Sequence, residues 1–198
     1  FVHQLLERGL SRDVILLELI TESAREIGLR WVADRLNFAE VSLACVRKHE
    51  IVHQLQAHAD EHPSHQTPTM NGRVLLASAP GSRHILGPVI VAEFFRNAGW
   101  YAQTLLPDHP EVLLSRTRTE WFDAIGISVS IDKQLEGLKK LVGSIRVQSK
   151  NPNACIFLGG PVFVLSSDHH PTEFDADAIC LDPRVTVTLA EISRLASR

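Results

Sequence analysis

The chain has 198 residues, of which 44% are hydrophobic and 22% are charged, and its formal net charge is −3. This composition can bury the core of one domain or of two smaller ones. The lack of a long basic run argues against a protein whose main partner is nucleic acid. Because no apolar run reaches the roughly 18 residues that span a bilayer, we expect no membrane association.

The cysteines indicate a reducing compartment. Cys45, Cys155 and Cys180 are an odd number at wide spacings, as is typical of buried free thiols and not of a disulfide framework. The first residues also lack the charged-then-apolar order of a signal peptide, so we expect a cytoplasmic protein. The chain begins at Phe1 and not at Met, which leaves open that it is part of a longer protein.

Residues 1–57 have the pattern of a small helical bundle with short connections. Apolar side chains recur at three- and four-residue steps, and proline is absent from the interiors. The predicted helices are 13–28, capped by Ser11; 29–36, which follows Gly28; and 38–56, capped by Asn37. Residues 58–72 are polar, contain two prolines and a glycine, and are predicted to form a linker.

From residue 73 to residue 198, short apolar runs alternate with helix-like segments. The alternation predicts an α/β domain with a five-stranded parallel sheet covered on both faces, flavodoxin-like (Rossmann-like), in the strand order 2-1-3-4-5. The predicted strands are 73–79, 100–106, 123–130, 154–160 and 176–182, and the predicted helices are 85–98, 109–119, 133–148 and 183–197.

In such sheets, ligands bind at the carboxyl ends of the strands near the switch point between strands 1 and 3. Three predicted strand ends carry residues suited to a ligand: backbone-exposing glycines, hydroxyls and one imidazole. They are Gly81, Ser82, His84 and Gly87 after strand 1, Ser128 and Ser130 at strand 3, and Gly159 and Gly160 at strand 4.

The segment S-R-H-I-L-G at 82–87, followed by Ser128 and Gly159-Gly160, resembles the cobalamin-binding signature D/E-x-H-x-x-G … S-x-L/T … G-G. The stretches GLSRDVILLELITESAREIGLRWVADRLNFAEVSL, APGSRHILG, WFDAIGISVSID and LGGPVF are similar to the AerR/PpaA group. Those proteins are cobalamin-binding antirepressors of photosynthesis genes, related to CarH-type cobalamin photoreceptors. The resemblance covers most of the chain.

The resemblance implies that the cofactor's nucleotide tail leaves cobalt and enters a slot beside Gly159 and Gly160, while His84 becomes the lower axial ligand. Cobalt takes imidazole nitrogen readily. The alternative is a loop histidine bonded to the backbone. The other residues implied to contact cobalamin in this domain are Ser82, Arg83, Gly87, Ser128 and Ser130.

Ser82 departs from the family pattern, since many members have Asp or Glu at this position. A carboxylate there orients the imidazole and raises its basicity. Ser82 can offer at most one neutral hydrogen bond, which speaks against methyl-transfer or mutase chemistry but not against binding.

The CarH-type bundle forms a lid over the corrin with the motif W-x9-E-H. At the matching distance from His84, this chain has Phe38 for Trp, Lys48 for Glu and His49 for His. The resemblance therefore implies that His49 is the upper cobalt ligand, with His53 one helical turn further along as a substitute. Phe38 and Trp31 would pack on the corrin or fill the bundle core.

Two other interpretations of His49 and His53 remain. Histidines four residues apart lie on one helix face and can begin a zinc site, whose further ligands would come from His58, His62 or His65. Both side chains can also be solvated.

We expect a non-enzymatic, light-responsive transcriptional regulator that binds cobalamin in the hydroxo/aquo or adenosyl form. The resemblance implies a repressor of the CrtJ/PpsR type as its protein partner. The alternatives are a corrinoid methyl carrier or enzyme cofactor domain, and a haem-binding redox sensor of similar fold.

Overall fold

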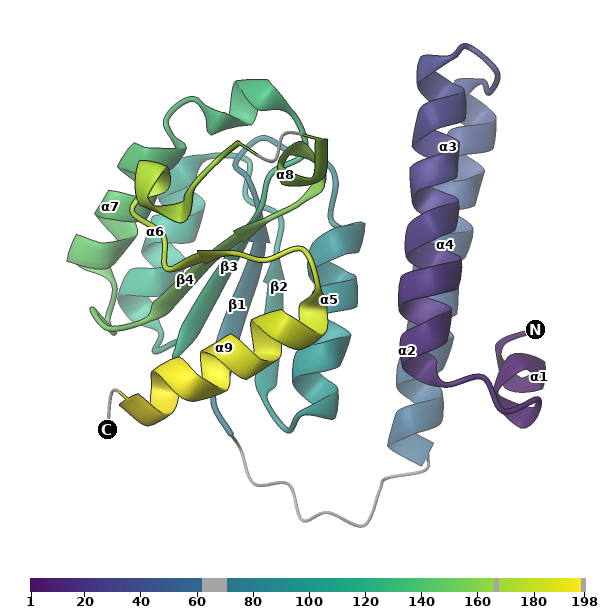
Figure 1. The fold of residues 1–198 in the computed structure, drawn as a ribbon, viewed down its shortest axis with the longest axis horizontal. Helices are drawn as coiled ribbons and strands as arrows, with labels where there is room; N and C mark the ends of the chain where they lie inside the picture. Colours follow the sequence, from purple (N-terminus) through teal and green to yellow (C-terminus); the bar gives the residue numbers. More distant parts are fainter. Residues whose placement is uncertain (62–70, 166–167, 197–198) are drawn as a thin grey trace. The chain divides into compact units, whose positions relative to one another are not determined.

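The computed structural model describes residues 1–61, 71–165 and 168–196. They form two compact units, one on each side of the gap after residue 61 (Figure 1). The predicted linker, 58–72, lies largely outside the described residues, and the last helix before it continues to Glu61. No helix of the described ranges is both long and apolar enough to cross a membrane.

The first unit is helical. Its elements are α1 (Val2–Glu7), α2 (Arg12–Val14), the π-helix η1 (Ile15–Thr21), α3 (Glu22–Val32) and α4 (Phe38–Glu61). Because α2, η1 and α3 follow one another without a break, the predicted end at Gly28 is wrong. One glycine costs a helix only about 1 kcal/mol, which the continuing hydrogen bonds and packing outweigh. The chain turns instead near Asp34, which has a φ of 53°.

Both predicted caps are confirmed. The Ser11 hydroxyl accepts a hydrogen bond from the Val14 N–H at 3.2 Å. Asn37 and Glu40 form a capping box, in which Asn37 Oδ1 accepts the Glu40 N–H at 3.0 Å and Glu40 Oε2 accepts the Asn37 N–H at 2.8 Å. The N-terminal bounds of α2 and α4 therefore follow from local side-chain chemistry.

The second unit confirms the predicted five-stranded parallel sheet, in the order β2-β1-β3-β4-β5. Its strands are β1 (Arg73–Ser78), β2 (Tyr101–Leu105), β3 (Ala124–Ser128), β4 (Cys155–Gly159) and β5 (Ala178–Ile179). Its helices are α5 (Leu86–Asn97), α6 (Pro110–Thr119), η2 (Asp132–Leu135), α7 (Leu138–Gln148), α8 (Pro161–Leu165), η3 (Pro171–Phe174) and α9 (Pro183–Ala196).

Helices cover both faces of this sheet, with α6 and α7 together on one side and α5 and α9 on the other (Figure 1). The main core lies between the sheet and α7, where Ile125, Ile127 and Ile156 pack with Val142 and Ile145. The predicted helix 133–148 is divided into η2 and α7 because Gly137 takes a φ of 77°. The short elements α8 and η3 were not predicted.

The three cysteines are free, as predicted. The predicted burial holds for Cys155 on β4 but is wrong for Cys45, which is exposed on α4. Burial raises the pKa of the Cys155 thiol from 9.0 to about 11, and burial also raises the pKa of Cys180.

We expect the free energy of unfolding to fall as the pH rises from 9 towards 11. The Cys155 thiol of the unfolded chain ionises in this range while that of the folded chain keeps its proton, so alkali favours unfolding. Urea denaturation at neutral and alkaline pH should show a smaller alkaline loss for Cys155→Ala than for the unaltered protein. Cys45→Ala, which removes an exposed thiol, is the control; an equal benefit from both variants would contradict the assignment.

Candidate functional site

The site lies where β1 and β3 end side by side. Ser78 and Ser128 are the last residues of these strands and are paired in register. The connection after β1 passes through α5 to one face of the sheet, and the connection after β3 leads to α7 on the other face (Figure 1). Such a divergence of connections is the switch point at which α/β sheets bind ligands.

The loop between β1 and α5 carries His84. Backbone hydrogen bonds fix its conformation. Gly81 makes the turn with a φ of 77° and donates its N–H to the Pro107 carbonyl at 2.9 Å, which joins the loop to the segment after β2. The Ser82 N–H bonds the Ala79 carbonyl at 2.9 Å.

Two serine hydroxyls hold the His84 backbone. Ser82 Oγ accepts the His84 N–H at 3.2 Å, and Ser78 Oγ donates to the His84 carbonyl at 2.7 Å. The imidazole itself is exposed, and its ring nitrogens make no hydrogen bond to any residue that the structure describes. Ser82 therefore shapes the loop and does not orient the ring.

The Ser128 hydroxyl lies between the start of α5 and the loop after β4. A Cβ atom added at Gly87 would stand 3.6 Å from Ser128 Oγ, and one added at Gly160 would stand 3.0 Å from it. Within the described ranges the hydroxyl has no hydrogen-bond partner. The fold thus brings together three pieces of the sequence pattern around one free hydroxyl.

Packing excludes a side chain at two of the three glycines of this site, but not at the third. A Cβ atom at Gly159 would lie 2.7 Å from the Cys180 carbonyl oxygen, and one at Gly160 would lie 2.3 Å from that of Val129, where φ is also +108°. The chain's own packing therefore requires both. Gly87 has no atom closer than 3.6 Å to its added Cβ, so packing does not explain it.

Two residues of the site were missed from the sequence. Ser78 is fully buried, yet it ends β1 as Ser128 ends β3, and that shared position was a usable signal. Gln134 Oε1 accepts the Ser130 N–H at 2.8 Å and so fixes the segment after β3. Arg83 is exposed and forms no ion pair in the described part of the chain.

In the first unit, His49 has one ring nitrogen bound and one free. Its Nδ1 lies 2.9 Å from the Cys45 carbonyl oxygen, which can only accept, so Nδ1 carries the proton and Nε2 keeps a lone pair. Nε2 is buried and has no hydrogen-bond partner among the residues that the structure describes. His53 is exposed. Phe38 and Trp31 are 76% and 44% exposed, so neither fills the bundle core.

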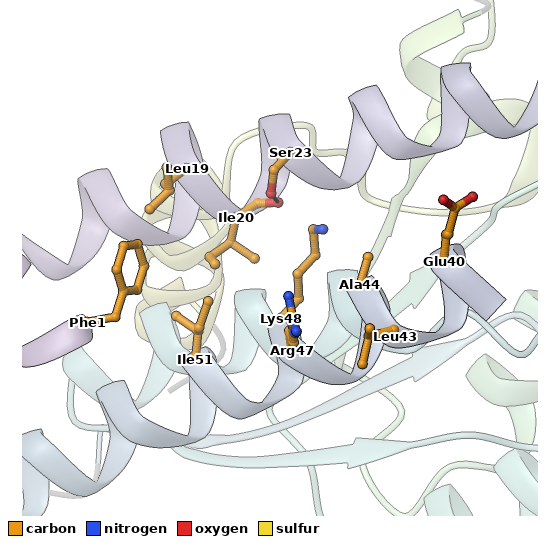
Figure 2. A pocket seen from close by; sticks show the side chains of 10 residues that line it. All are labelled: Phe1, Leu19, Ile20, Ser23, Glu40, Leu43, Ala44, Arg47, Lys48 and Ile51. Atoms are coloured by element: carbon orange, nitrogen blue, oxygen red, sulfur yellow. Dashed lines mark hydrogen bonds between the residues drawn. The ribbon is translucent and has the colours of Figure 1, made fainter. Parts of the chain in front are cut away.

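Lys48 is only 7% exposed and points towards Ile20 and Ser23 in a depression of about 390 Å³ (Figure 2). Burial lowers the pKa of its ammonium group, and the neighbouring Cys45 opposes that shift. The depression is lined by residues of the first unit: Phe1, Leu19, Ile20, Ser23, Glu40, Leu43, Ala44, Arg47, Lys48 and Ile51. Lys48 thus packs between helices.

The zinc interpretation finds no support in the described ranges, where no three His, Cys, Asp or Glu side chains group as metal ligands. The ring of His58 lies 6.1 Å from that of His3. His62 and His65 lie outside the described residues.

Known proteins are similar to this chain in sequence. A model of the B12 binding domain family matches residues 72–176. An uncharacterized 20.5 kDa protein in the bchF-crtJ intergenic region of Rhodobacter capsulatus is 33% identical over 144 residues, which are 72% of this chain and 73% of that protein. The family match includes the whole His84 loop, Ser128, Gly159 at the end of β4 and Gly160 after it.

Solved structures show the same fold. The monomethylamine corrinoid protein of Methanosarcina barkeri is 15% identical, with a TM-score of 0.78 over 96% of this chain and 88% of that one. A cobalamin-binding protein from Desulfitobacterium hafniense DCB-2 is 14% identical, with a TM-score of 0.56 over 97% of this chain and 88% of that one. At these identities the likeness concerns the fold alone.

Gly160→Ala should lower the free energy of unfolding by roughly 1–3 kcal/mol, because alanine disfavours the positive φ and its methyl group would meet the Val129 backbone. Gly87→Ala should not destabilise the protein, since alanine is the better helix former and has room. Gly143→Ala in α7, where the added Cβ meets nothing within 4 Å, is the matched control. Urea denaturation measures all three; an equal loss at Gly87 and Gly160 would refute the distinction.

Proposed function

Because the chain belongs to the B12-binding domain family, we propose that it is a cobalamin-binding regulator that acts through a protein partner and not by catalysis. The observation that carries the proposal is the grouping of a free imidazole, a free Ser128 hydroxyl and the unfilled space at Gly87 at one switch point. When bound, cobalamin supplies a cobalt ion with exchangeable axial ligands.

The residues present fit this cofactor. The His84 ring is exposed, and neither ring nitrogen bonds to any of the described residues, so cobalt can take a nitrogen lone pair without breaking a hydrogen bond to them. Ser128 offers a hydroxyl to a polar ligand group, and Gly87 leaves the backbone of α5 open to close approach. We assign His84 as the lower ligand and place the nucleotide tail beside Gly87 and Ser128.

A regulator is favoured over a methyl carrier by the hydrogen bonds of Ser82. Its hydroxyl binds the His84 N–H, so it does not tune the imidazole as a carboxylate on the ring would. The Rhodobacter capsulatus relative lies in the bchF-crtJ intergenic region, and a CrtJ/PpsR-type repressor is the partner that the AerR/PpaA resemblance implies. We therefore propose such a repressor as the partner, with light setting the state of the upper ligand.

His49 is proposed as the conditional upper ligand. Its Nδ1–H bonds the Cys45 carbonyl, an arrangement common in metal-binding histidines, because it fixes the tautomer and leaves Nε2 as the donor. Nε2 is buried, so a local rearrangement must expose it before it binds cobalt. A ligand shifts a conformational equilibrium only through such a difference in contacts between two states.

His84→Ala should weaken the binding of hydroxocobalamin by more than about tenfold, since the lower ligand is lost. Titration followed by the visible spectrum measures the change. His3→Ala, which removes an exposed histidine of α1, is the matched control. Unchanged affinity and spectrum in His84→Ala would refute the assignment, and purification with a haem spectrum would favour the haem-sensor alternative.

His49→Ala should retain cobalamin through His84 but shift the absorption spectrum of the hydroxocobalamin complex towards a water-ligated form. It should also weaken light-dependent binding to the repressor. His53→Ala is the matched control on the same helix, one turn further along. A shift in His53→Ala alone would make His53 the ligand, and no shift in either would place the upper ligand elsewhere.

A further inference from the structure

Ser78 and Ser82 each hydrogen-bond a different backbone group of His84. Ser78 is 0% exposed and Ser82 is 6% exposed, so both hydroxyls lie within the protein. Ser82 accepts the backbone N–H of His84, and Ser78 donates to its backbone carbonyl. The two main-chain polar groups of His84 are thereby both engaged by side chains, while its ring is engaged by none in the described ranges.

These two bonds come from different parts of the chain, one from within the loop and one from the end of β1. Ser82 is two residues before His84 and forms a local turn of the kind that Ser, Asn and Asp side chains make. Ser78 is six residues before it, at the end of β1, where its backbone is held by the pairing with β3. Ser82 therefore sets the loop's local shape, and Ser78 fixes that shape to the rigid sheet.

We propose that Ser78 and Ser82 are positioning residues that preorganise His84 for cobalt through its backbone. This proposal rests on the proposed function. The clamp, defined as these two hydroxyl contacts, fixes the place from which the imidazole projects and leaves only its side-chain torsions to be ordered on ligation. A site held in advance loses less conformational freedom when it binds.

A carboxylate at position 82 could bond both the backbone and the ring of His84, whereas the clamp provides only the backbone contact. An aspartate can accept the same backbone N–H and still have a second oxygen for the ring. Serine has a single oxygen, and this chain uses it for the backbone. The chain thus keeps the position of the lower ligand while omitting the contact that would raise its basicity.

The test uses the full chain with cobinamide. This corrinoid lacks the nucleotide tail, so its binding reports the coordination by His84 apart from any contact of the tail. Ser78→Ala and Ser82→Ala should each weaken binding about three- to tenfold, as expected for one neutral hydrogen bond. Both should also reduce the nitrogen coupling from the protein in the electron paramagnetic resonance spectrum of the reduced cobalt. Ser82→Asp should restore both signals, because its carboxylate can accept the same N–H. Ser115→Ala, which removes an exposed hydroxyl of α6, is the matched control.

A double-mutant cycle with His84→Ala separates positioning from a general effect on the fold. If the serines act through His84, their substitution should cost no further affinity once the imidazole is gone. Losses that persist in the His84→Ala background, or serine variants indistinguishable from Ser115→Ala, would overturn the clamp and leave the proposed function standing. Absence of protein nitrogen coupling in the unaltered protein would overturn both.

Discussion

The parallel pairing of β1 with β3 is the constraint on which the site depends. It places Ser78 opposite Ser128, so that the hydroxyl of one supports the His84 loop while the hydroxyl of the other faces the start of α5. Because side chains alternate across a strand, a slip of one residue would turn either serine to the other face. The register of two buried strands thus determines where a loop histidine stands.

Some residues of the cobalamin-binding signature are required by packing, whereas others are not. Gly159 and Gly160 are needed because side chains there would collide with the Cys180 and Val129 backbones, whatever the site binds. Gly87 has no such neighbour. A bound ligand is therefore indicated by Gly87 and by the Ser128 hydroxyl, which has no hydrogen-bond partner among the described residues. The glycine pair is a weaker indication.

The sequence predicts what short-range chemistry or a regular period determines. The alternation of apolar runs gives the sheet order, and Ser11 and Asn37 cap helices because their oxygens reach N–H groups three residues away. It did not predict the bond from Ser78 to His84, which depends on how the loop returns to β1. The burial of His49 Nε2 and the exposure of Phe38 depend on helix packing, which spacing alone does not determine.

The two histidines assigned to cobalt are held in opposite ways. His84 has a fixed backbone and a free, exposed ring, so coordination breaks no contact of the protein. His49 has a ring bound through Nδ1 and a buried Nε2, so coordination requires the helix surroundings to change first. Under the proposed function, the lower ligand is therefore constant and the upper ligand is conditional. Only the conditional one alters the protein's conformation, and only such a change can carry a signal to a partner.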